Sequence, residues 1–325
     1  MVASDGMCGH NSEALLEYNL MAKSKIPDRS HIRTEYSNLA SRSLDIMPVQ
    51  QAVLLMNQED QRAVTAVGAQ SEAIARAVEM VAAAFIRGGR LIYVGAGTSG
   101  RLGVLDATEC PPTFSTDPGM VVGVIAGGPT ALTSSIENVE DDDSAGAAAV
   151  ENLAVGSNDV VFGIAAGGTT PFVYGALGEA RRRQAKTIFQ VCTAREHVTI
   201  PVDLIIAVDT GPEVLTGSTR LKAGTATKLV LNTVTTLSMV RLGKVMSNTM
   251  VDLDAAKNSK LVDRGVRIIQ EFTGLSRDHA LELLFEAQGR VKRAIVMHHH
   301  HCDAATADRL LAEDGGRLRA VLKVP

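Results

Sequence analysis

Two segments of the chain combine glycines with hydroxyl side chains directly after short apolar runs. The first reads Val94-Gly95-Ala96-Gly97-Thr98-Ser99-Gly100-Arg101, and the second reads Gly163-Ile164-Ala165-Ala166-Gly167-Gly168-Thr169-Thr170-Pro171. Glycines let backbone N–H groups turn toward a ligand, and a helix that follows presents the partial positive charge of its N-terminus. Both segments therefore fit a phosphate monoester, and the candidate ligands are Gly97, Thr98, Ser99, Gly167, Gly168, Thr169 and Thr170.

The glycine pattern permits two other interpretations. Gly95, Gly97 and Gly100 also have the spacing of a dinucleotide-binding turn, but that site needs an acidic residue about 20 residues later, at the end of the next strand. The next apolar run ends in Ile125-Ala126-Gly127-Gly128 without one. Tight turns without any ligand are the other alternative, although the adjacent Ser and Thr residues favour a sugar phosphate.

Two acidic segments supply carboxyl groups that could transfer protons. Residues 106–112, Asp-Ala-Thr-Glu-Cys-Pro-Pro, place Glu109 just before a double proline, which we expect to end a helix. Residues 136–143 hold Glu140 in an acidic run, a pattern that is also typical of a solvated surface. Two carboxyls of opposite protonation state form an acid and base pair, but neither segment alone identifies a reaction.

Three further features permit both a functional and a structural interpretation. Ser218 and Lys222, with Glu213, Thr219 and Arg220, precede a long helical pattern, where they form either an anion site or a helix cap with a solvated basic turn. Residues 298–301 are four consecutive histidines, which cannot share one helix face, so we expect no metal site there. Cys110 could act as a nucleophile, but we favour a packing role for it because no general base is near it in sequence.

The spacing of apolar residues predicts the elements that must position these groups. Residues 43–88 have helical periodicity. Short runs rich in β-branched residues follow at 91–94, 121–126, 160–165, 187–191 and 204–208, and helical segments separate them. This pattern predicts an α/β fold with a parallel sheet covered by helices on both faces, whose ligand site lies at the carboxyl ends of the strands.

Downstream of Ser218 we expect only helices, over residues 221–242, 251–272, 280–287 and 304–311. The expected domains are a loosely ordered extension (1–33), an α/β domain with a helical lead-in (34–273) and a small C-terminal helical domain (274–325).

Composition excludes several classes of partner. The 325 residues carry a formal net charge of -4, so no broad positive field favours nucleic acid or an anionic membrane. No signal-type or membrane-spanning segment is visible, and the four cysteines show no CxxC pair, so we expect a cytoplasmic protein with reduced thiols and no zinc site. An aromatic content of 3% argues against a stacking platform for bases.

The motifs together resemble the N-acetylmuramic acid 6-phosphate etherase family. The matching segments are residues 94–103, the Asp-Ala-Thr-Glu-Cys-Pro-Pro-Thr-Phe of 106–114, residues 125–128, residues 139–142, and the Thr-Gly-Pro-Glu-Val-Leu-Thr-Gly-Ser-Thr-Arg-Leu-Lys-Ala-Gly-Thr-Ala-Thr-Lys of 210–228. The resemblance runs from about Thr34 to Arg319. It implies a sugar isomerase (SIS) type α/β domain, a homodimer, and cleavage of the lactyl ether of N-acetylmuramic acid 6-phosphate without a metal or nucleotide cofactor.

The resemblance also implies the roles of two residues. Glu109 corresponds to the glutamate that protonates the departing lactate, and Glu140 corresponds to the second catalytic carboxyl. The second glycine segment departs from the family, which usually has Ala-Ala-Ser-Gly-Arg-Thr-Pro-Tyr, because Gly167 and Thr169 replace the Ser and Arg. We expect weaker affinity or altered substrate preference from this change. A sugar-phosphate isomerase and a noncatalytic sugar-phosphate-binding regulator of the same fold are the alternatives.

Overall fold

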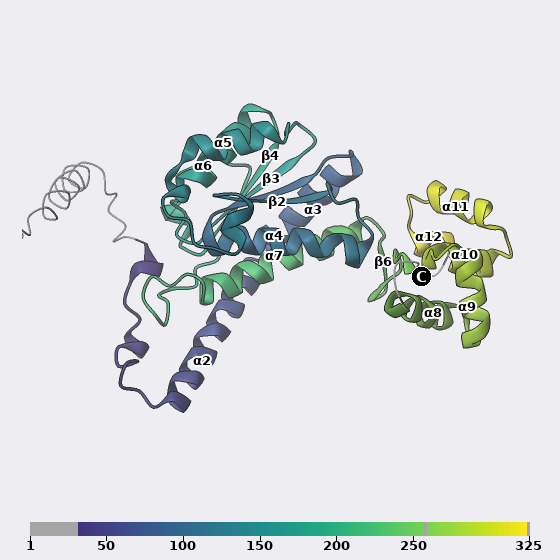
Figure 1. Ribbon diagram of the computed structural model, residues 1–325, viewed down its shortest axis with the longest axis horizontal. Helices are drawn as coiled ribbons and strands as arrows, with labels where there is room; N and C mark the ends of the chain where they lie inside the picture. The colour runs from purple at the N-terminus through teal and green to yellow at the C-terminus, as the bar shows by residue number, and fades with distance from the viewer. Residues whose placement is uncertain (1–31, 256–258, 324–325) are drawn as a thin grey trace, which may run out of the picture.

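A five-stranded parallel sheet organises the larger part of the molecule (Figure 1). The computed structural model describes residues 32–255 and 259–323. The expected extension at residues 1–33 therefore lies almost entirely outside the described residues. The strands are β1 (Leu91–Gly95), β2 (Val121–Ile125), β3 (Val160–Ala165), β4 (Lys186–Val191) and β5 (Leu204–Ala207), in the order β2-β1-β3-β4-β5. All four pairings are parallel, as the sequence predicted.

Helices cover both faces of this sheet. One face packs against α3 (Ser71–Ile86), α4 (Gly97–Phe114) and α7 (Lys222–Arg241), and the other packs against α5 (Asp143–Asn152) and α6 (Pro171–Arg182). Neighbouring residues of β1 alternate between the two cores: Tyr93 belongs to the first, whereas Ile92 and Val94 belong to the second. Because both faces are buried, near-continuous apolar strands are stable here, and the predicted α/β class is confirmed.

Helix α4 differs from the expected element at its end. The double proline Pro111-Pro112 lies inside the helix, which continues to Phe114. Each proline has the helical φ but lacks an N–H donor, and its ring crowds the carbonyl one turn earlier. The buried Phe114 ring packs the last turn against the core and offsets this cost. Glu109 therefore lies inside α4 and not at its end.

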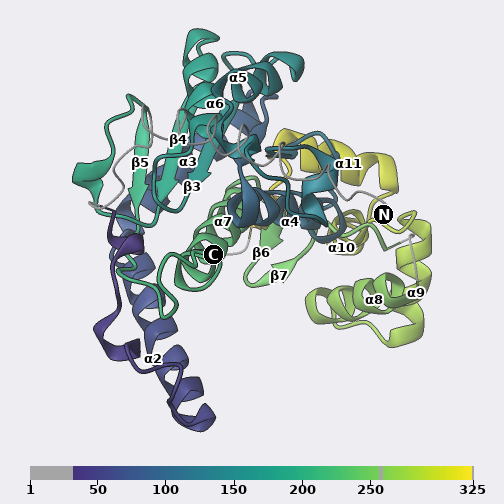
Figure 2. The same cartoon turned by 60° about the vertical axis from the view of Figure 1, so that its left-hand side comes forward.

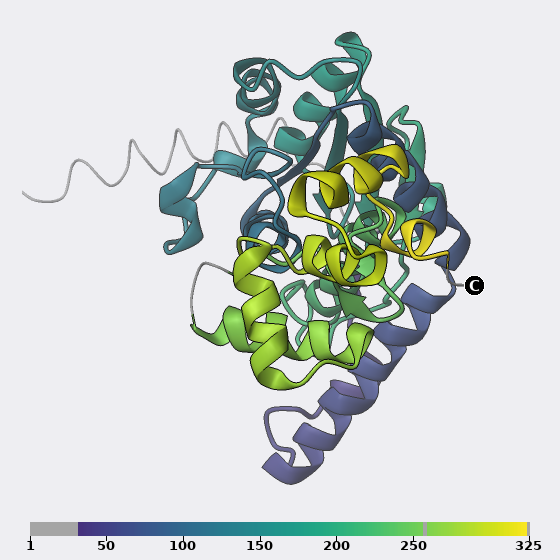
Figure 3. The same cartoon turned by 90° about the vertical axis from the view of Figure 1, so that its right-hand side faces the viewer.

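The C-terminal part forms a second core. A short antiparallel hairpin, β6 (Val245–Met246) and β7 (Thr249–Met250), leads into α8 (Ser259–Thr273), α9 (Arg277–Glu286), α10 (Val291–His300), α11 (Ala304–Glu313) and α12 (Leu318–Val321). The hairpin was not expected, and residues 251–254 are not helical. One hydrophobic cluster joins Met246 to the helices that follow, α8 included. Met246 and α8 therefore pack with the helices that follow residue 274. Figure 3 shows the C-terminal helices gathered in one group.

Helix α2 (Val49–Gly68) packs against α7 and extends beyond the sheet and its covering helices (Figures 1 and 2). Five 3₁₀ turns complete the described elements: η1 (Arg33–Glu35), η2 (Leu39–Ser41), η3 (Pro129–Leu132), η4 (Val139–Asp141) and η5 (Arg195–His197). None of the described helices is long and apolar enough to cross a membrane.

Candidate active site

The two glycine segments meet at the point where the strand order reverses. Strands β1 and β3 are neighbours, with Gly95 paired to Ile164, but the chain leaves β1 through α4 toward β2 on the other side. The loops after β1 and β3 therefore diverge and leave a crevice at the carboxyl ends of the strands. A pocket of about 260 Å³ lies there, and both loops line it.

The first loop is built by close packing of glycines. A side-chain carbon on Gly95 would lie 2.7 Å from the backbone nitrogen of Gly100, so the first turn of α4 lies directly on the end of β1. Gly97 has a positive φ of 52° and begins α4. Gly97, Thr98 and Ser99 all line the pocket, with the N-terminus of α4 beside them.

The second loop presents another helix start to the same pocket. Gly167, Thr169 and Thr170 line it, and α6 begins at Pro171. Gly168 has a φ of 76° and is not among the lining residues; its carbonyl accepts a hydrogen bond from the Tyr174 hydroxyl. A side-chain carbon on Gly167 would meet only ordinary contacts, the nearest at 3.5 Å, so the serine expected there would fit.

The acidic residues at positions 140–142 have different roles. Glu140, in η4, and Asp141 line the pocket, whereas Asp142 caps α5 by accepting a hydrogen bond from the Ala145 N–H at 2.9 Å. The run is therefore not simply a solvated surface. Its candidate Glu140 lies beside both glycine loops.

One wall of the pocket was not foreseen. Ile32, Thr34 and Glu35 line it together with Gly217 and Thr219. The Gly217 N–H donates to the Thr34 carbonyl at 3.2 Å, which joins this segment to the loop before α7. The match with the family begins at Thr34-Glu35 and was the only sequence signal for this wall. We call residues 32–38 the N-terminal strap.

Glu109 does not reach this pocket within one chain. It lies more than three turns farther along α4 than Gly97, about 18 Å at ~1.5 Å per residue, and it is exposed. Its helix is anchored by the buried Asp106, which accepts hydrogen bonds from Tyr93, Asn232 and Thr235. The neighbouring Cys110 is buried, and burial raises the pKa of its thiol to about 12, so it packs as a neutral thiol and is no nucleophile.

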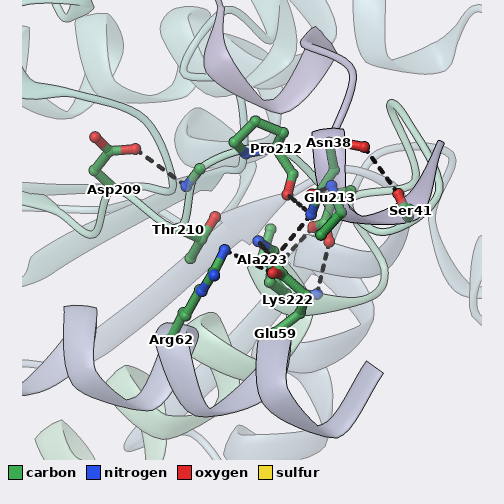
Figure 4. Close-up of polar contacts among 12 residues, drawn as sticks. Asn38, Ser41, Glu59, Arg62, Asp209, Thr210, Pro212, Glu213, Lys222 and Ala223 are labelled. Carbon is green, nitrogen blue, oxygen red and sulfur yellow. Dashed lines mark hydrogen bonds and ion pairs between the residues drawn. The ribbon is translucent and has the colours of Figure 1, made fainter. Parts of the chain in front are cut away.

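Lys222 belongs to a buried ion pair and not to the pocket (Figure 4). Its ammonium lies 2.6 Å from a Glu59 carboxylate oxygen, and both side chains are only about 1–2% exposed. Asn38 donates to Glu59 at 2.9 Å and to the Pro212 carbonyl at 3.3 Å, so the strap is joined to α2 and to the segment before α7.

The first backbone N–H groups of α7 already have a hydrogen-bond partner within the chain. The Glu213 carboxylate accepts the backbone N–H groups of Lys222 at 3.0 Å and Ala223 at 2.9 Å. Glu213 thus caps α7, as one interpretation of the 213–222 cluster expected, but Lys222 lies in the buried ion pair and not in a solvated turn. The role of Lys222 as a ligand stays a prediction. Ser218 lies between the lining residues Gly217 and Thr219, and its role as a ligand stays a prediction.

Comparison with known proteins identifies the family of this chain. The profile described as the glucokinase regulatory protein N-terminal SIS domain matches residues 73–181. The N-acetylmuramic acid 6-phosphate etherase of Gloeobacter violaceus is 53% identical over 300 residues, which cover 92% of this chain and 97% of that protein. The etherase of Crocosphaera subtropica is 51% identical over 298 residues, with 92% and 97% covered. The chain belongs to the N-acetylmuramic acid 6-phosphate etherase family.

The likeness of this chain to solved structures is weaker than its likeness to these etherases. The phosphoheptose isomerase of Neisseria gonorrhoeae is 18% identical, with a TM-score of 0.43, over 60% of this chain and 98% of that one. Membership of the etherase family therefore rests on the whole-length relatives. The SIS domain match fits the parallel sheet and its flanking helices.

The pocket of this etherase-family member is lined without cations. No lysine, arginine or histidine is among the described residues around it, and its ionisable side chains are Glu35, Glu140 and Asp141. Neutral donors must therefore hold any phosphate: the first N–H groups of α4 and α6 and the threonine and serine hydroxyls. In the described part of the chain no group of three or more His, Cys, Asp or Glu side chains could hold a metal ion, the histidines at the end of α10 included.

The buried ion pair gives a stability prediction. We expect Lys222→Met to lower the free energy of unfolding by about 3–5 kcal/mol, because it leaves the Glu59 carboxylate buried beside only Asn38 and Arg62. Urea unfolding followed by circular dichroism measures the change. Lys260→Met, at an exposed position of α8, is the matched control and should change stability by less than about 0.5 kcal/mol. Equal stability of the two variants would contradict the structural role.

Proposed function

We propose that the protein cleaves the D-lactyl ether of N-acetylmuramic acid 6-phosphate and releases N-acetylglucosamine 6-phosphate and D-lactate. The observation that carries the proposal is the 53% identity to an etherase over nearly its whole length. The pocket supports it, because two helix N-termini suited to a phosphate lie beside the carboxyl group of Glu140.

The reaction follows from the chemistry of the open-chain sugar. Once C1 is an aldehyde, the C2 hydrogen is acidic, and Glu140 removes it. The bond between C3 and the ether oxygen then breaks as an acid, Glu109, protonates that oxygen, so lactate leaves with it. Water adds to the C2–C3 double bond at C3, and C2 regains a proton. Each placed proton-transfer group contributes about 10²–10⁴-fold in rate.

Two chains are needed to bring the two carboxyls together. Within one chain Glu109 is about 18 Å along α4 from the glycine that lines the pocket, too far to act on a sugar whose C2 lies at Glu140. The active unit in our proposal is a homodimer in which Glu109 of one chain faces the pocket of the other.

Exposed apolar side chains support a dimer. Leu105 lies one helical turn before Glu109, and α7, which packs on α4, exposes Leu237 and Val240. The projecting α2 exposes a further set: Val49, Val53, Leu54, Met56 and Val64. The eight exposed apolar side chains come from helices that pack on one another, α2 on α7 and α7 on α4, and their burial between two chains would favour a dimer.

Release of D-lactate from N-acetylmuramic acid 6-phosphate by the purified protein tests the activity. We expect the unphosphorylated sugar to react at least about 100-fold less efficiently, since hydrogen bonds to a charged group contribute ~1.5–3 kcal/mol each and several N–H groups face the phosphate. Comparable kcat/KM for the two sugars would contradict phosphate recognition.

The same assay separates the alternatives. Conversion of the sugar phosphate to a ketose without lactate would indicate an isomerase. Binding without any turnover would indicate a regulator. The matched SIS domain profile is described from such a protein, the glucokinase regulatory protein. Retention of both Glu109 and Glu140 favours the etherase.

A further inference from the structure

We infer that Glu35, on the N-terminal strap, opens and recloses the sugar ring in the pocket. The inference rests on the proposed function and adds a step that precedes the removal of the C2 proton. It assigns a catalytic residue to a wall of the site that neither Glu109 nor Glu140 occupies.

The proposed reaction requires a ring-opening step. In the pyranose form C1 is bonded to two oxygens by single bonds, so no carbonyl group acidifies the C2 hydrogen. Opening the ring converts C1 to an aldehyde and moves one proton from the C1 hydroxyl to the ring oxygen O5. A general acid and base beside O1 and O5 accelerates this transfer.

The pocket offers few groups for this transfer. Among the described residues that line it, the ionisable side chains are Glu35, Glu140 and Asp141. Glu140 and Asp141 are consecutive residues of one 3₁₀ turn and therefore belong to the same wall. Glu35 comes from a different wall, the strap, and is the one of the three that can approach the sugar from another side than Glu140.

The backbone around Glu35 is fixed. The strap is joined to Gly217 by the hydrogen bond to the Thr34 carbonyl and, three residues past Glu35, to α2 by the bond from Asn38 to Glu59. Gly217 has a φ of 74° and no side chain, and a carbon there would lie 3.3 Å from a Glu35 carboxylate oxygen. The bare glycine thus leaves room for this carboxyl group.

The Glu35 carboxylate itself is uncommitted. It makes no hydrogen bond or ion pair with the side chains of residues 32–255 or 259–323, in contrast to Glu59 and Glu213 nearby. A fixed backbone with an unpaired carboxylate at a pocket wall is what an acid and base group needs.

Thr34 gives an independent sign that this wall contacts a ligand. Thr34 is 0% exposed, yet its hydroxyl has no hydrogen-bond partner among the described residues, and the residue lines the pocket. Buried hydroxyls without a partner are rare in folded proteins, because losing water without replacement costs free energy. The wall that holds Glu35 therefore contains a polar group whose hydrogen bond the described residues do not satisfy.

The step is balanced with one carboxyl group. The Glu35 carboxylate accepts the proton of the C1 hydroxyl, the C1–O5 bond breaks with its electron pair left on O5, and O5 takes that proton from the carboxyl. Nothing is oxidised or reduced, and Glu35 returns to its ionised form. The reverse sequence closes the ring of the product.

Anomer exchange of N-acetylglucosamine 6-phosphate isolates this step, because that sugar has no lactyl ether to lose. Magnetisation-transfer NMR measures the rate at which its α and β anomers interconvert through the open chain. We expect the wild-type protein to accelerate the exchange and Glu35→Gln to lose the acceleration. Glu140→Gln should keep it, since ring opening leaves the C2 hydrogen in place.

Turnover of the etherase substrate gives the second readout. We expect Glu35→Gln to lower kcat/KM for lactate release about 100-fold, the low end for a placed acid and base group, because spontaneous ring opening sets a floor. Asp45→Asn is the matched control: it removes a carboxylate from an exposed position of the same N-terminal region and should behave as wild type. Melting temperatures of both variants should equal that of the wild type, since neither carboxylate has a hydrogen-bond or ion-pair partner among the described residues to lose.

Three results would overturn the assignment. They are anomer exchange by Glu35→Gln at the wild-type rate, loss of exchange in Asp141→Asn instead, and no acceleration by the wild-type protein. Failure of the proposed function gives a different result, because a protein that opens the ring but is no etherase accelerates anomer exchange and releases no lactate.

Discussion

We expect the Glu140→Gln variant to lose both lactate release and exchange of the C2 hydrogen with solvent deuterium. Glutamine keeps the size of the side chain but cannot accept the proton, so no carbanion-like intermediate forms. Glu109→Gln should also lose lactate release, by about 10²–10⁴-fold, but should still exchange the C2 hydrogen, because the base remains and only the acid toward the ether oxygen is missing.

Proton NMR of the substrate in deuterium oxide, with a parallel assay of lactate, measures both quantities. Deuterium at C2 with Glu140→Gln and none with Glu109→Gln would reverse the two roles. A single carboxyl serving as base and then as acid is the remaining alternative, and it predicts undiminished lactate release when the other glutamate is replaced. Such a result would remove that residue from the mechanism.

Activity should return when the two inactive variants share one dimer. In a mixed dimer of Glu109→Gln and Glu140→Gln chains, one site combines the intact Glu140 of the first chain with the intact Glu109 of the second. The other site lacks both. We therefore expect a mixed dimer, coexpressed with two affinity tags and purified through both, to have about half the wild-type kcat with an unchanged KM.

The matched control is the mixed dimer of Glu140→Gln and Glu35→Gln chains. Glu140 and Glu35 line the pocket of the same chain, so mixing leaves no site with both residues intact. If the Glu109 and Glu140 mixture stays as inactive as its parents, the two glutamates do not come from different chains. A fully active monomer in light scattering would contradict the dimeric site as well.

Local patterns were sufficient to predict the sheet and its ligand loops. Strands such as Val160–Ala165 are apolar at every position because both faces are buried, and that pattern is visible without knowledge of the fold. The parallel order then brings Gly97 and Gly167 to one edge, so the meeting of the two glycine loops follows from chain order and glycine spacing.

Features that depend on distant parts of the chain were not predictable in this way. Lys222 resembles a ligand in sequence, and its partner Glu59 is far away on α2, so the buried ion pair is invisible until the chain is folded. The double proline was expected to end α4 early, but tertiary packing of Phe114 carries the helix through it.

The separation of the catalytic candidates has the same origin. Glu109 and Glu140 are both present in the family motifs, and only the direction of α4, away from the pocket, shows that one chain does not join them. The strap residue Glu35 was overlooked because it precedes every predicted element and reaches the pocket only through its contact with Gly217.

Cleavage in water enriched in oxygen-18 tests the proposed reaction most directly. If lactate leaves with the ether oxygen and water then adds at C3, the released D-lactate contains no oxygen-18 in its hydroxyl group, and the C3 hydroxyl of N-acetylglucosamine 6-phosphate contains one atom. Mass spectrometry of the lactate and the isotope shift of the C3 carbon signal measure the two positions. Oxygen-18 in the lactate hydroxyl, or no release of lactate at all, would contradict the account.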